Sequence, residues 1–269
     1  LCLFLYLSRH RNCFNFGMVR KKQKKASMKL FGLVGRNIDY SFSRTHFSEK
    51  FKREQLQCTY ENFDLQSIEE FPHILKSKNI SGLNVTIPYK EDILPYLDDL
   101  DKEAQAIGAV NTIKIKNGKL TGYNTDHYGF KKSLLPYLKI TYKKALILGT
   151  GGASKAVSYA LKSLGIDVYF VSRFPLNEQT LSYKDLDHNA LQQYSIIVNC
   201  TPLGTHPNIE KYPPIPYSGL DQNHLLYDLI YNPKETQFLN FGKKANATLI
   251  NGLEMLRLQA EKSWEIWHS

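Results

Sequence analysis

A lysine stands just beyond a strand-like segment that ends in a proline. The stretch GLNVTIPYKE runs from Gly82 to Glu91, and Lys90 follows Pro88 by two places. Because proline fixes the backbone at the end of the strand, the lysine side chain leaves a rigid platform. A lysine placed in this way can serve as a general acid–base group. A solvated surface lysine is the alternative, so the choice depends on which other motifs converge on Lys90.

A second segment that could form a binding site is ALILGTGGASKA. Its Gly149, Gly151 and Gly152 separate a buried strand from a helix. Glycines permit the tight turn and let backbone N–H groups approach a pyrophosphate at the helix N-terminus. Glycine is also needed in ordinary strand–helix turns. Here a strand precedes the turn and an amphipathic helix follows it, and this context predicts dinucleotide binding.

The strand that follows this unit favours NADP over NAD. An NAD-binding unit carries Asp or Glu at the end of this strand, where the carboxylate binds the ribose hydroxyls. The strand DVYFVSR has Asp167 at its beginning and Ser172 and Arg173 at its far end. A guanidinium at that end can pair with a 2′-phosphate that no carboxylate repels. The alternative is an ordinary surface arginine.

Other polar residues indicate a site only when they are considered together with the other motifs. Ser41 and Ser43 lie two apart, so on an extended chain both hydroxyls can donate to one carboxylate. Asn111 and Asp126 end or follow short predicted strands, where a polar side chain can face a cleft. Taken alone, the two serines predict a loop, and Asn and Asp are frequent in turns.

The elements that must position these residues alternate between apolar runs and helical patterns. Such alternation predicts an α/β fold with a mostly parallel sheet and helices on both faces. We expect two short strands around the Asn117–Gly118 turn, which is a hairpin signal. Further strands are expected at 29–35, 58–65, 82–88, 144–148, 167–173, 195–200, 225–231 and 247–251. Helices are expected at 44–56, at 68–75, over all or part of 92–108, after 126, after 152 and at 253–267.

Composition bounds the class of protein. The 269 residues suffice for one large or two modest domains, and the 42% apolar and 22% charged residues are ordinary for a globular protein. No apolar run approaches the ~18 residues of a transmembrane helix, so we expect no membrane partner. The four cysteines show no metal-binding or disulfide spacing, which predicts no metal and fits a reducing cytoplasm.

The net charge of +10 is concentrated at one end. Residues 1–27 carry seven Lys and Arg residues and no acid, which leaves 28 basic and 25 acidic residues, a net charge of +3, from Met28 onward. The body therefore has no strong electrostatic reason to bind nucleic acid. We expect residues 1–27 to be an extraneous or disordered basic tail, with Met28 as the natural start.

Six segments occur in order along the chain, namely GLNVTIPYK, AIGAVNTI, GYNTD, ILGTGGASKA, VNCTPLG and NGLEMLRLQA. Together they resemble the shikimate dehydrogenase family, whose members reduce 3-dehydroshikimate reversibly with NADPH on the route to chorismate and aromatic amino acids. The resemblance covers Met28 to Trp267. It implies a substrate-binding domain at 28–126, completed by a C-terminal helix at 252–269, and a Rossmann-like NADP-binding domain at 127–251, with a cleft between them.

The resemblance also implies roles for single residues. Lys90 matches the catalytic lysine and Asp126 its acidic partner. Substrate contacts fall at Ser41, Ser43, Thr86, Asn111, Asp126, Tyr231 and Gln259, with the two serines on the substrate carboxylate. Cofactor contacts fall at Gly149, Thr150, Gly151, Gly152, Ala153, Ser172, Arg173, Thr201, Leu229 and Gly252. The implied partners are a small-molecule substrate and NADP, in a monomer or homodimer.

Two segments depart from the family's pattern. The usual His-Ser-x-Ser-Pro reads YSFSR at 40–44, so both hydroxyls remain, while Arg44 either attracts the carboxylate or caps the turn. The usual Asn-Arg-Thr reads SRF at 172–174, and a second basic residue that is frequent nearby is absent. We therefore expect Arg173 to carry most of the preference for NADP.

Two rival classes remain open. One is another NAD(P) enzyme on a related scaffold, such as a quinate-type dehydrogenase that uses NAD or a methylene-tetrahydrofolate dehydrogenase. The folate enzyme is disfavoured by the Ser-x-Ser and Asn-Thr-Asp segments. The other class is a non-catalytic nucleotide-binding paralogue, against which the presence of both Lys90 and Asp126 argues.

Overall fold

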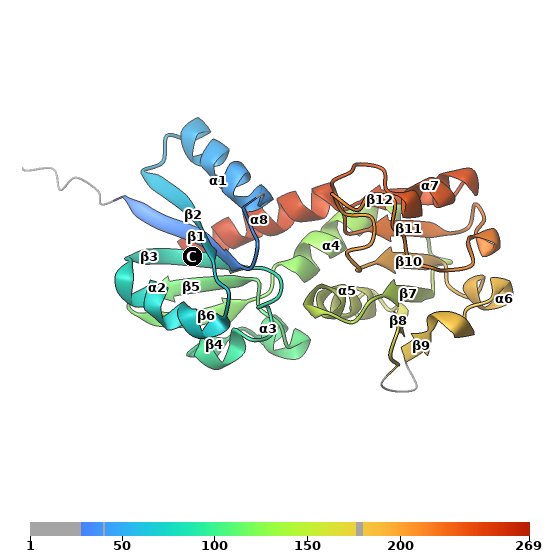
Figure 1. The fold of residues 1–269 in the computed structure, drawn as a ribbon, viewed down its shortest axis with the longest axis horizontal. Helices are drawn as coiled ribbons and strands as arrows, with labels where there is room; N and C mark the ends of the chain where they lie inside the picture. Colours follow the sequence, from blue (N-terminus) through green and yellow to red (C-terminus); the bar gives the residue numbers. More distant parts are fainter. Residues whose placement is uncertain (1–27, 40, 176–179) are drawn as a thin grey trace, which may run out of the picture.

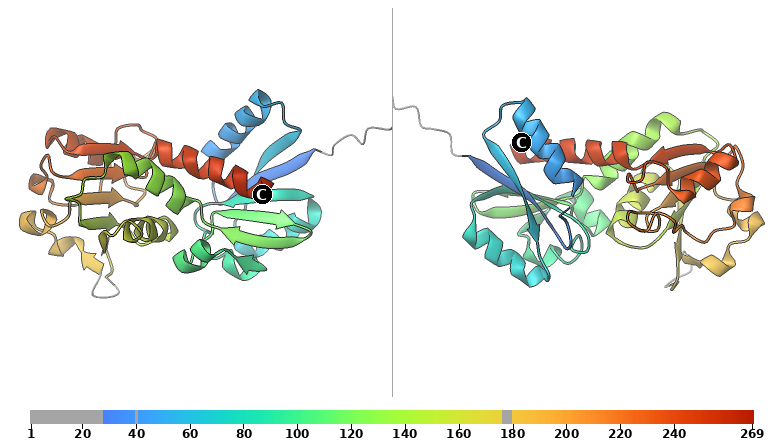
Figure 2. Two further views of the ribbon diagram at one scale, coloured as in Figure 1. Left: turned by 180° about the vertical axis from the view of Figure 1, so that it is seen from behind. Right: turned by 45° about the horizontal axis from the view of Figure 1, so that its top comes forward.

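The structure, a computed structural model, describes residues 28–39, 41–175 and 180–269, and the predicted tail at 1–27 lies outside the described residues. The chain forms two lobes that lie side by side (Figure 1), and two further views show the same division (Figure 2). Each lobe contains one six-stranded sheet. We refer to them as the N-terminal lobe and the Rossmann lobe.

The sheet of the N-terminal lobe is mixed. Its strands are β1 (Lys29–Gly35), β2 (Cys58–Asp64), β3 (Ile80–Val85), β4 (Asp99–Leu100), β5 (Thr112–Lys116) and β6 (Lys119–Tyr123), in the order β2-β1-β3-β5-β6-β4. Strand β1 pairs in parallel with β2 and β3, whereas β5 is antiparallel to both β3 and β6. The predicted hairpin is confirmed, since Lys116 pairs with Lys119 across the Asn117–Gly118 turn.

The sheet of the Rossmann lobe is parallel throughout. Its strands are β7 (Lys144–Leu148), β8 (Asp167–Ser172), β9 (Thr180–Ser182), β10 (Ile196–Asn199), β11 (Leu225–Asp228) and β12 (Thr248–Asn251), in the order β12-β11-β10-β7-β8-β9. The strand order reverses beside β7. In open α/β sheets, ligands bind at the carboxyl ends of the strands next to such a reversal.

The helices are α1 (Phe42–Arg53), α2 (Phe71–Ser77), α3 (Lys102–Ile107), α4 (Asp126–Leu134), α5 (Gly152–Lys162), α6 (His188–Leu191), α7 (Gln237–Lys244) and α8 (Leu253–His268). Short 3₁₀ turns lie at Ile68–Glu70, Leu94–Tyr96, Leu135–Tyr137, Tyr183–Asp185 and Tyr217–Gly219. None of the helices in the described part of the chain is long and apolar enough to cross a membrane. The sequence analysis did not predict α6, β4 and β9, which have at most four residues each. It also missed α7, although the buried Phe238, Leu239 and Gly242 share one face of that helix.

The Ser41–Ser43 segment is neither fully extended nor an ordinary loop, because a helix begins within it. Helix α1 begins at Phe42, earlier than expected, and Ser41 is its N-cap residue, with its Oγ accepting the Arg44 N–H at 3.3 Å. Ser43 therefore lies in the first helical turn. Serine is a preferred N-cap because its hydroxyl satisfies one of the free N–H groups at a helix start.

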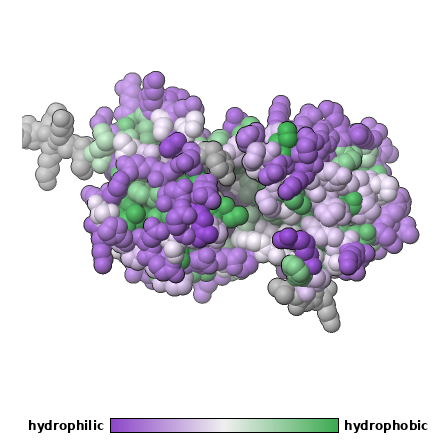
Figure 3. All heavy atoms as spheres, in the orientation of Figure 1, coloured by the Kyte–Doolittle hydropathy of each residue, from purple (hydrophilic) through white to green (hydrophobic). Residues whose placement is uncertain are grey.

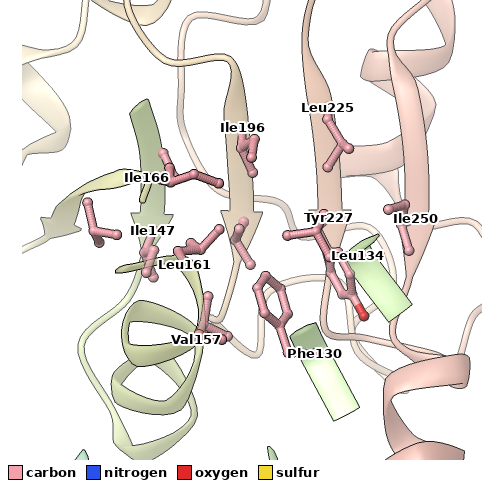
Figure 4. Close-up of a cluster of buried hydrophobic side chains, with 14 of the residues drawn as sticks. Phe130, Leu134, Ile147, Val157, Leu161, Ile166, Ile196, Leu225, Tyr227 and Ile250 are labelled. Atoms are coloured by element: carbon pink, nitrogen blue, oxygen red, sulfur yellow. The ribbon is translucent and has the colours of Figure 1, made fainter. Parts of the chain in front are cut away.

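Apolar side chains from helices on one face of the Rossmann sheet meet the strands beneath them (Figure 4). Phe130 and Leu134 of α4 and Val157 and Leu161 of α5 are all fully buried there. Each such side chain contributes about 1.5–3 kcal/mol to stability. This packing holds α4 and α5 rigidly, and both helices begin at predicted site residues.

Helix α8 extends from the Rossmann lobe across to the N-terminal lobe (Figure 1) and packs on α4, β3 and β5. Near its end, Trp267 is 8% exposed and stacks on Phe31 with ring centroids 4.8 Å apart. The Trp267 indole N–H donates to the Ile113 carbonyl at 3.0 Å. The last helix of the chain is therefore anchored in the core of the first lobe.

We predict that Trp267→Ala lowers the free energy of unfolding by about 3–5 kcal/mol, because it leaves a cavity among aromatic rings and an unpaired carbonyl. Trp267→Phe should cost less, since a ring still fills the site. Urea denaturation measures both. Ile140→Ala is the control, because Ile140 is 89% exposed. An effect of Trp267→Ala as small as that of the control would show that α8 is not anchored here.

Candidate active site

A cavity of about 220 Å³ lies where the N-terminal lobe faces the Rossmann lobe. The space-filling view shows the surface hollowed between the lobes (Figure 3). The cavity is lined by all the residues predicted to contact substrate or to act in catalysis: Ser41, Ser43, Thr86, Lys90, Asn111, Asp126, Tyr231 and Gln259. They come from the start of α1 and its N-cap, the turn after β3, the residue before β5, the start of α4, the loop after β11, and α8.

Lys90 and Asp126 form the charged pair of the cavity. The Lys90 Nζ lies 2.6 Å from Asp126 Oδ2, and the side chains are 18% and 8% exposed. Lys90 lies in the turn after β3, and its carbonyl accepts the Val110 N–H at 2.8 Å. Asp126 is the first residue of α4, a position where the helix dipole favours a negative charge. An ammonium group is therefore held at the cavity wall by one carboxylate oxygen.

The other Asp126 oxygen is held by Asn111. The Asn111 Nδ2 donates to Asp126 Oδ1 at 2.9 Å and contacts Gln259 Oε1 at 3.3 Å, while Asn111 Oδ1 accepts the Thr125 N–H at 2.7 Å. Asn111 immediately precedes β5 and does not end a strand as predicted, although it faces the cavity. The amide thus fixes the orientation of the Asp126 carboxylate.

The two serines line the cavity, with Ser41 at the N-cap of α1 and Ser43 in its first turn. Ser41 Oγ lies 3.2 Å from Asn62 Oδ1 as well as capping the helix, and Ser43 is buried. The Arg44 guanidinium donates to the Asp39 carbonyl at 3.1 Å and does not line the cavity. Of the two roles expected for Arg44, the structure shows the cap, through its backbone N–H on Ser41 Oγ. Its side chain binds the preceding loop and does not reach the cavity.

Tyr231 approaches the cavity from the Rossmann lobe. Its ring meets the Phe42 ring edge-on, with centroids 5.9 Å apart. Phe42 lies between the two serines and also lines the cavity. An aromatic contact between the lobes therefore borders the site.

A second cavity, of about 500 Å³, lies at the carboxyl ends of the Rossmann strands. Six predicted cofactor residues line it: Gly149, Thr150, Gly151, Ser172, Arg173 and Thr201. Gly152 and Ala153 form the first turn of α5 directly behind this lining. Ile87 lines both cavities, so the two sites adjoin.

The residues around this second cavity fit a dinucleotide. Gly149 has φ of +105°, a conformation that side-chain-bearing residues rarely adopt, and a Cβ on Gly151 would point into open space. Gly149 thus permits the tight turn, and Gly151 leaves room for a phosphate beside the N-terminus of α5. Arg173 is the cation among the described lining residues, which include no Asp or Glu. That charge pattern suits NADP, as the sequence predicted.

Thr201 is positioned by a buried network behind the second cavity. Asn199 Oδ1 accepts the Thr201 hydroxyl at 2.7 Å, and Asn199 Nδ2 donates to Asp228 Oδ1 at 3.0 Å. The Thr236 hydroxyl donates to the other Asp228 oxygen at 2.5 Å. Burial raises the pKa of Asp228 to about 6, although hydrogen bonds from Thr236, Ile230 and Asn199 oppose this shift.

The remaining two predicted cofactor residues, Leu229 and Gly252, do not line the second cavity. They lie against each other at the ends of β11 and β12, where a Cβ on Gly252 would lie 2.0 Å from the Leu229 carbonyl oxygen. The Gly252 N–H donates to the Ile230 carbonyl at 3.1 Å. Their predicted contact with nucleotide stays a prediction.

Several lining residues were not predicted from the sequence. Arg36, Phe42, Ile87 and Leu256 line the first cavity, and Tyr183 the second. A pattern was available for Leu256, which lies three residues before Gln259 on α8 and so shares its helix face. Tyr183 follows β9, an element that the sequence did not reveal, and burial raises its pKa.

The fold and the two adjoining cavities define a two-lobed α/β protein with a Rossmann-like nucleotide site beside a lysine-bearing polar site. Within the described residues, no group of three or more His, Cys, Asp or Glu side chains could hold a metal ion.

Comparisons with known proteins agree with this class. A family model described as the shikimate dehydrogenase substrate binding domain matches residues 33–113. A shikimate dehydrogenase (NADP(+)) of Clostridium botulinum is 42% identical over 246 residues, which cover 88% of this chain and 95% of that relative.

Two solved structures are also similar. A shikimate dehydrogenase of Peptoclostridium difficile has 39% identity and a TM-score of 0.79, covering 90% of this chain and 92% of its own. A shikimate 5-dehydrogenase of Thermus thermophilus, in complex with NADP(H) and shikimate, has 31% identity and a TM-score of 0.79, covering 89% and 93%. The chain belongs to the shikimate dehydrogenase family.

We predict a pH dependence of stability from Asp228. Because its folded pKa of about 6 exceeds the usual 3.8, its contribution to stability is fully present below about pH 4 and is lost as the pH rises through 6. Between pH 4 and 7.5, wild type should therefore lose about 2–3 kcal/mol of unfolding free energy relative to Asp228→Asn.

Urea denaturation across this pH range measures the difference. Asp167→Asn is the matched control, because Asp167 is exposed at the start of β8 in the same sheet. A wild-type-minus-variant difference that does not change with pH would contradict the prediction.

Proposed function

We propose that this protein catalyses the reversible NADPH-dependent reduction of 3-dehydroshikimate to shikimate, on the route to chorismate and aromatic amino acids. The observation that carries the proposal is the Lys90–Asp126 pair at 2.6 Å in a polar cavity that adjoins the nucleotide cavity at Ile87. The relatives support the same reaction, since one is a shikimate dehydrogenase (NADP(+)) and another was solved in complex with NADP(H) and shikimate.

The polar residues of the first cavity suit a polyhydroxylated ring with one carboxylate. The hydroxyls of Ser41 and Ser43, which line the cavity, can donate to the carboxylate. Lys90, Asn111 and Asp126 lie together at the cavity wall and offer both donors and acceptors to ring hydroxyls. Thr86, Gln259 and Tyr231 complete the proposed substrate contacts.

Lys90 is proposed as the general acid–base group. In the direction of reduction, its ammonium donates a proton to the substrate oxygen as that oxygen gains negative charge, and in oxidation the neutral amine accepts it. Asp126 holds the lysine nitrogen in place and is itself oriented by Asn111. NADP, when bound, supplies or accepts the hydride.

Gly149 to Ala153 are proposed to receive the pyrophosphate, with Ser172 and Arg173 on the 2′-phosphate. Thr201, Leu229 and Gly252 are proposed to lie near the nicotinamide side. The division into a substrate-binding domain at 28–126 with 252–269, and an NADP-binding domain at 127–251, is part of this proposal. It is supported by α8, which belongs to the end of the chain but packs on β3 and β5.

The rival functions are separated by assay. A quinate-type enzyme would turn over quinate with NAD, and a non-catalytic paralogue would bind nucleotide without turnover. We propose a small-molecule substrate as the partner, with no nucleic acid or membrane partner. A monomeric or homodimeric state and a cytoplasmic location stay predictions, and shikimate with NADP, against quinate and NAD, is the first assay.

We predict that Lys90→Ala lowers kcat for shikimate oxidation by about 10²–10⁴-fold, the usual contribution of a positioned acid–base group. The KM for shikimate should change much less, because the other polar contacts remain. Lys119→Ala, which removes an exposed lysine of the same lobe, is the control. Near-wild-type kcat in Lys90→Ala would remove this residue from the mechanism.

We predict that Arg173→Asp shifts the preference from NADP toward NAD. The arginine can make charge-assisted hydrogen bonds to a 2′-phosphate, each worth roughly 1.5–3 kcal/mol, whereas aspartate repels the phosphate and can accept from ribose hydroxyls. The kcat/KM values for both cofactors measure this change. Lys184→Asp, a basic position just beyond β9, controls for the overall change of charge. An unchanged NADP:NAD ratio would show that the 2′-phosphate is bound elsewhere.

A further inference from the structure

Three consecutive residues of the turn after β3 point to three different places. Tyr89 is buried in the N-terminal lobe, and its hydroxyl donates to the Leu65 carbonyl at 2.7 Å. Lys90 faces Asp126 in the cavity. The Glu91 carboxylate lies 2.5 Å from Lys155 Nζ, on helix α5 of the Rossmann lobe. The turn that carries the proposed acid–base group is therefore tied to both lobes.

One stripe of α5 faces this turn. Gly152, Lys155, Ala156 and Tyr159 have the spacing i, i+3, i+4 and i+7, which places them on one face of a helix. We call these four residues the α5 stripe.

Each member of the α5 stripe touches the N-terminal side of the molecule. A Cβ on Gly152 would lie 3.3 Å from Lys90 Cβ, so glycine permits the close approach. Ala156 packs in a buried cluster with Ile107 and Ala109. Tyr159 packs against the same cluster, and its ring also meets the His127 ring of α4 edge-on, at 5.3 Å between centroids.

The same helix begins at the nucleotide cavity. Gly151 is its N-cap residue, and the cavity is lined by Gly149, Thr150 and Gly151. The N-terminus of α5 is thus directed to the nucleotide site, while its side carries Lys155 toward Glu91. A shift of α5 on nucleotide binding would be transmitted to the residue beside Lys90.

We propose that Glu91 and Lys155 are positioning residues. Their ion pair holds Lys90 in its reactive position, and this position depends on where the bound nucleotide places α5. The inference rests on the proposed function for the reaction that Lys90 serves. The two side chains are 42% and 39% exposed, so solvent screens the pair and its effect on stability is small. The pair acts instead on the position of Lys90, because a displacement of about 1 Å at a reacting group can lower the rate up to 10²-fold.

Two other arrangements compete with this one. The Lys90 backbone is already held by the buried Tyr89 and by the Val110 N–H, which could suffice without Glu91. Lys155 lies on the first turn of α5, where an ammonium could instead bind the phosphates directly. Each alternative gives a different pattern of kinetic constants.

The kinetic test compares Glu91→Ala, Lys155→Ala and the double variant in the full chain, with shikimate and NADP. We expect each single variant to lower kcat about tenfold, with KM for both substrates within about twofold of wild type. The double variant should resemble either single one, because the residues act through each other. The melting temperature should stay near the wild-type value, and Lys119→Ala, which breaks a surface pair with Asp99, should change nothing.

Other results would overturn the proposal. Unchanged kcat in Glu91→Ala would show that Tyr89 and Val110 suffice to place Lys90. A higher KM for NADP in Lys155→Ala alone, with Glu91→Ala unaffected, would assign Lys155 to the phosphates. Effects that add fully in the double variant would show that the two residues act separately.

A second measurement does not depend on turnover. Hydrogen exchange of residues 86–94 should slow when NADP binds to wild type, and this slowing should be lost in Glu91→Ala while residues 149–155 still respond. An equal response of residues 86–94 in wild type and variant, or none in wild type, would overturn the coupling. If wild type binds NADP but does not oxidise shikimate, the proposed function fails, while the exchange result still decides the coupling.

Discussion

The carboxamide of Asn111 is the interaction on which the rest of the site depends. It is buried, and it meets Thr125, Asp126 and Gln259 at once. A buried amide is costly unless its donors and acceptors are paired, so these partners must come together in one geometry. The same network continues through Thr112 and Ser263 to Asn84 on β3. This network fixes the relative positions of β3, β5, α4 and α8. As a consequence, the Asp126 carboxylate faces Lys90.

The two lobes are independent in their sheets but not in their helices. Helix α4 carries Asp126 at its start and the buried Phe130 in the Rossmann core, while α8 leaves that lobe and ends with Trp267 against Phe31. Because each helix belongs to both lobes, the two cavities are held next to each other. Ile87 at their junction is 69% exposed, which is unusual for an isoleucine, and it gives both cavities a common apolar wall.

The charged side chains at each cavity match the function proposed for it. The first contains an ammonium matched by a carboxylate, so the site holds a proton donor without an uncompensated charge. The second has Arg173 without an acid among its described lining residues, which leaves it attractive to anions. Asp228 is kept behind the second cavity and is paired with Thr236 and Asn199, so its buried carboxylate does not face the phosphates.

The sequence by itself determined the features that depend on local pattern: the apolar strands, the Asn117–Gly118 hairpin, the glycine turn before α5, and the absence of a carboxylate at the end of β8. Motif order also indicated which residues would share a cavity, and the eight proposed substrate and catalytic residues do line one. Only the tertiary structure decided that Ser41 caps a helix, that Asn111 orients Asp126, and that Glu91 reaches Lys155 across the lobes. The Ser41 cap spans only three positions, but the other two contacts join residues 15 and 64 positions apart, so local periodicity carries no information about them. The Asn111 contact exists because a buried amide must find partners, and the Glu91 contact exists because the packing of α5 brings Lys155 to the turn after β3.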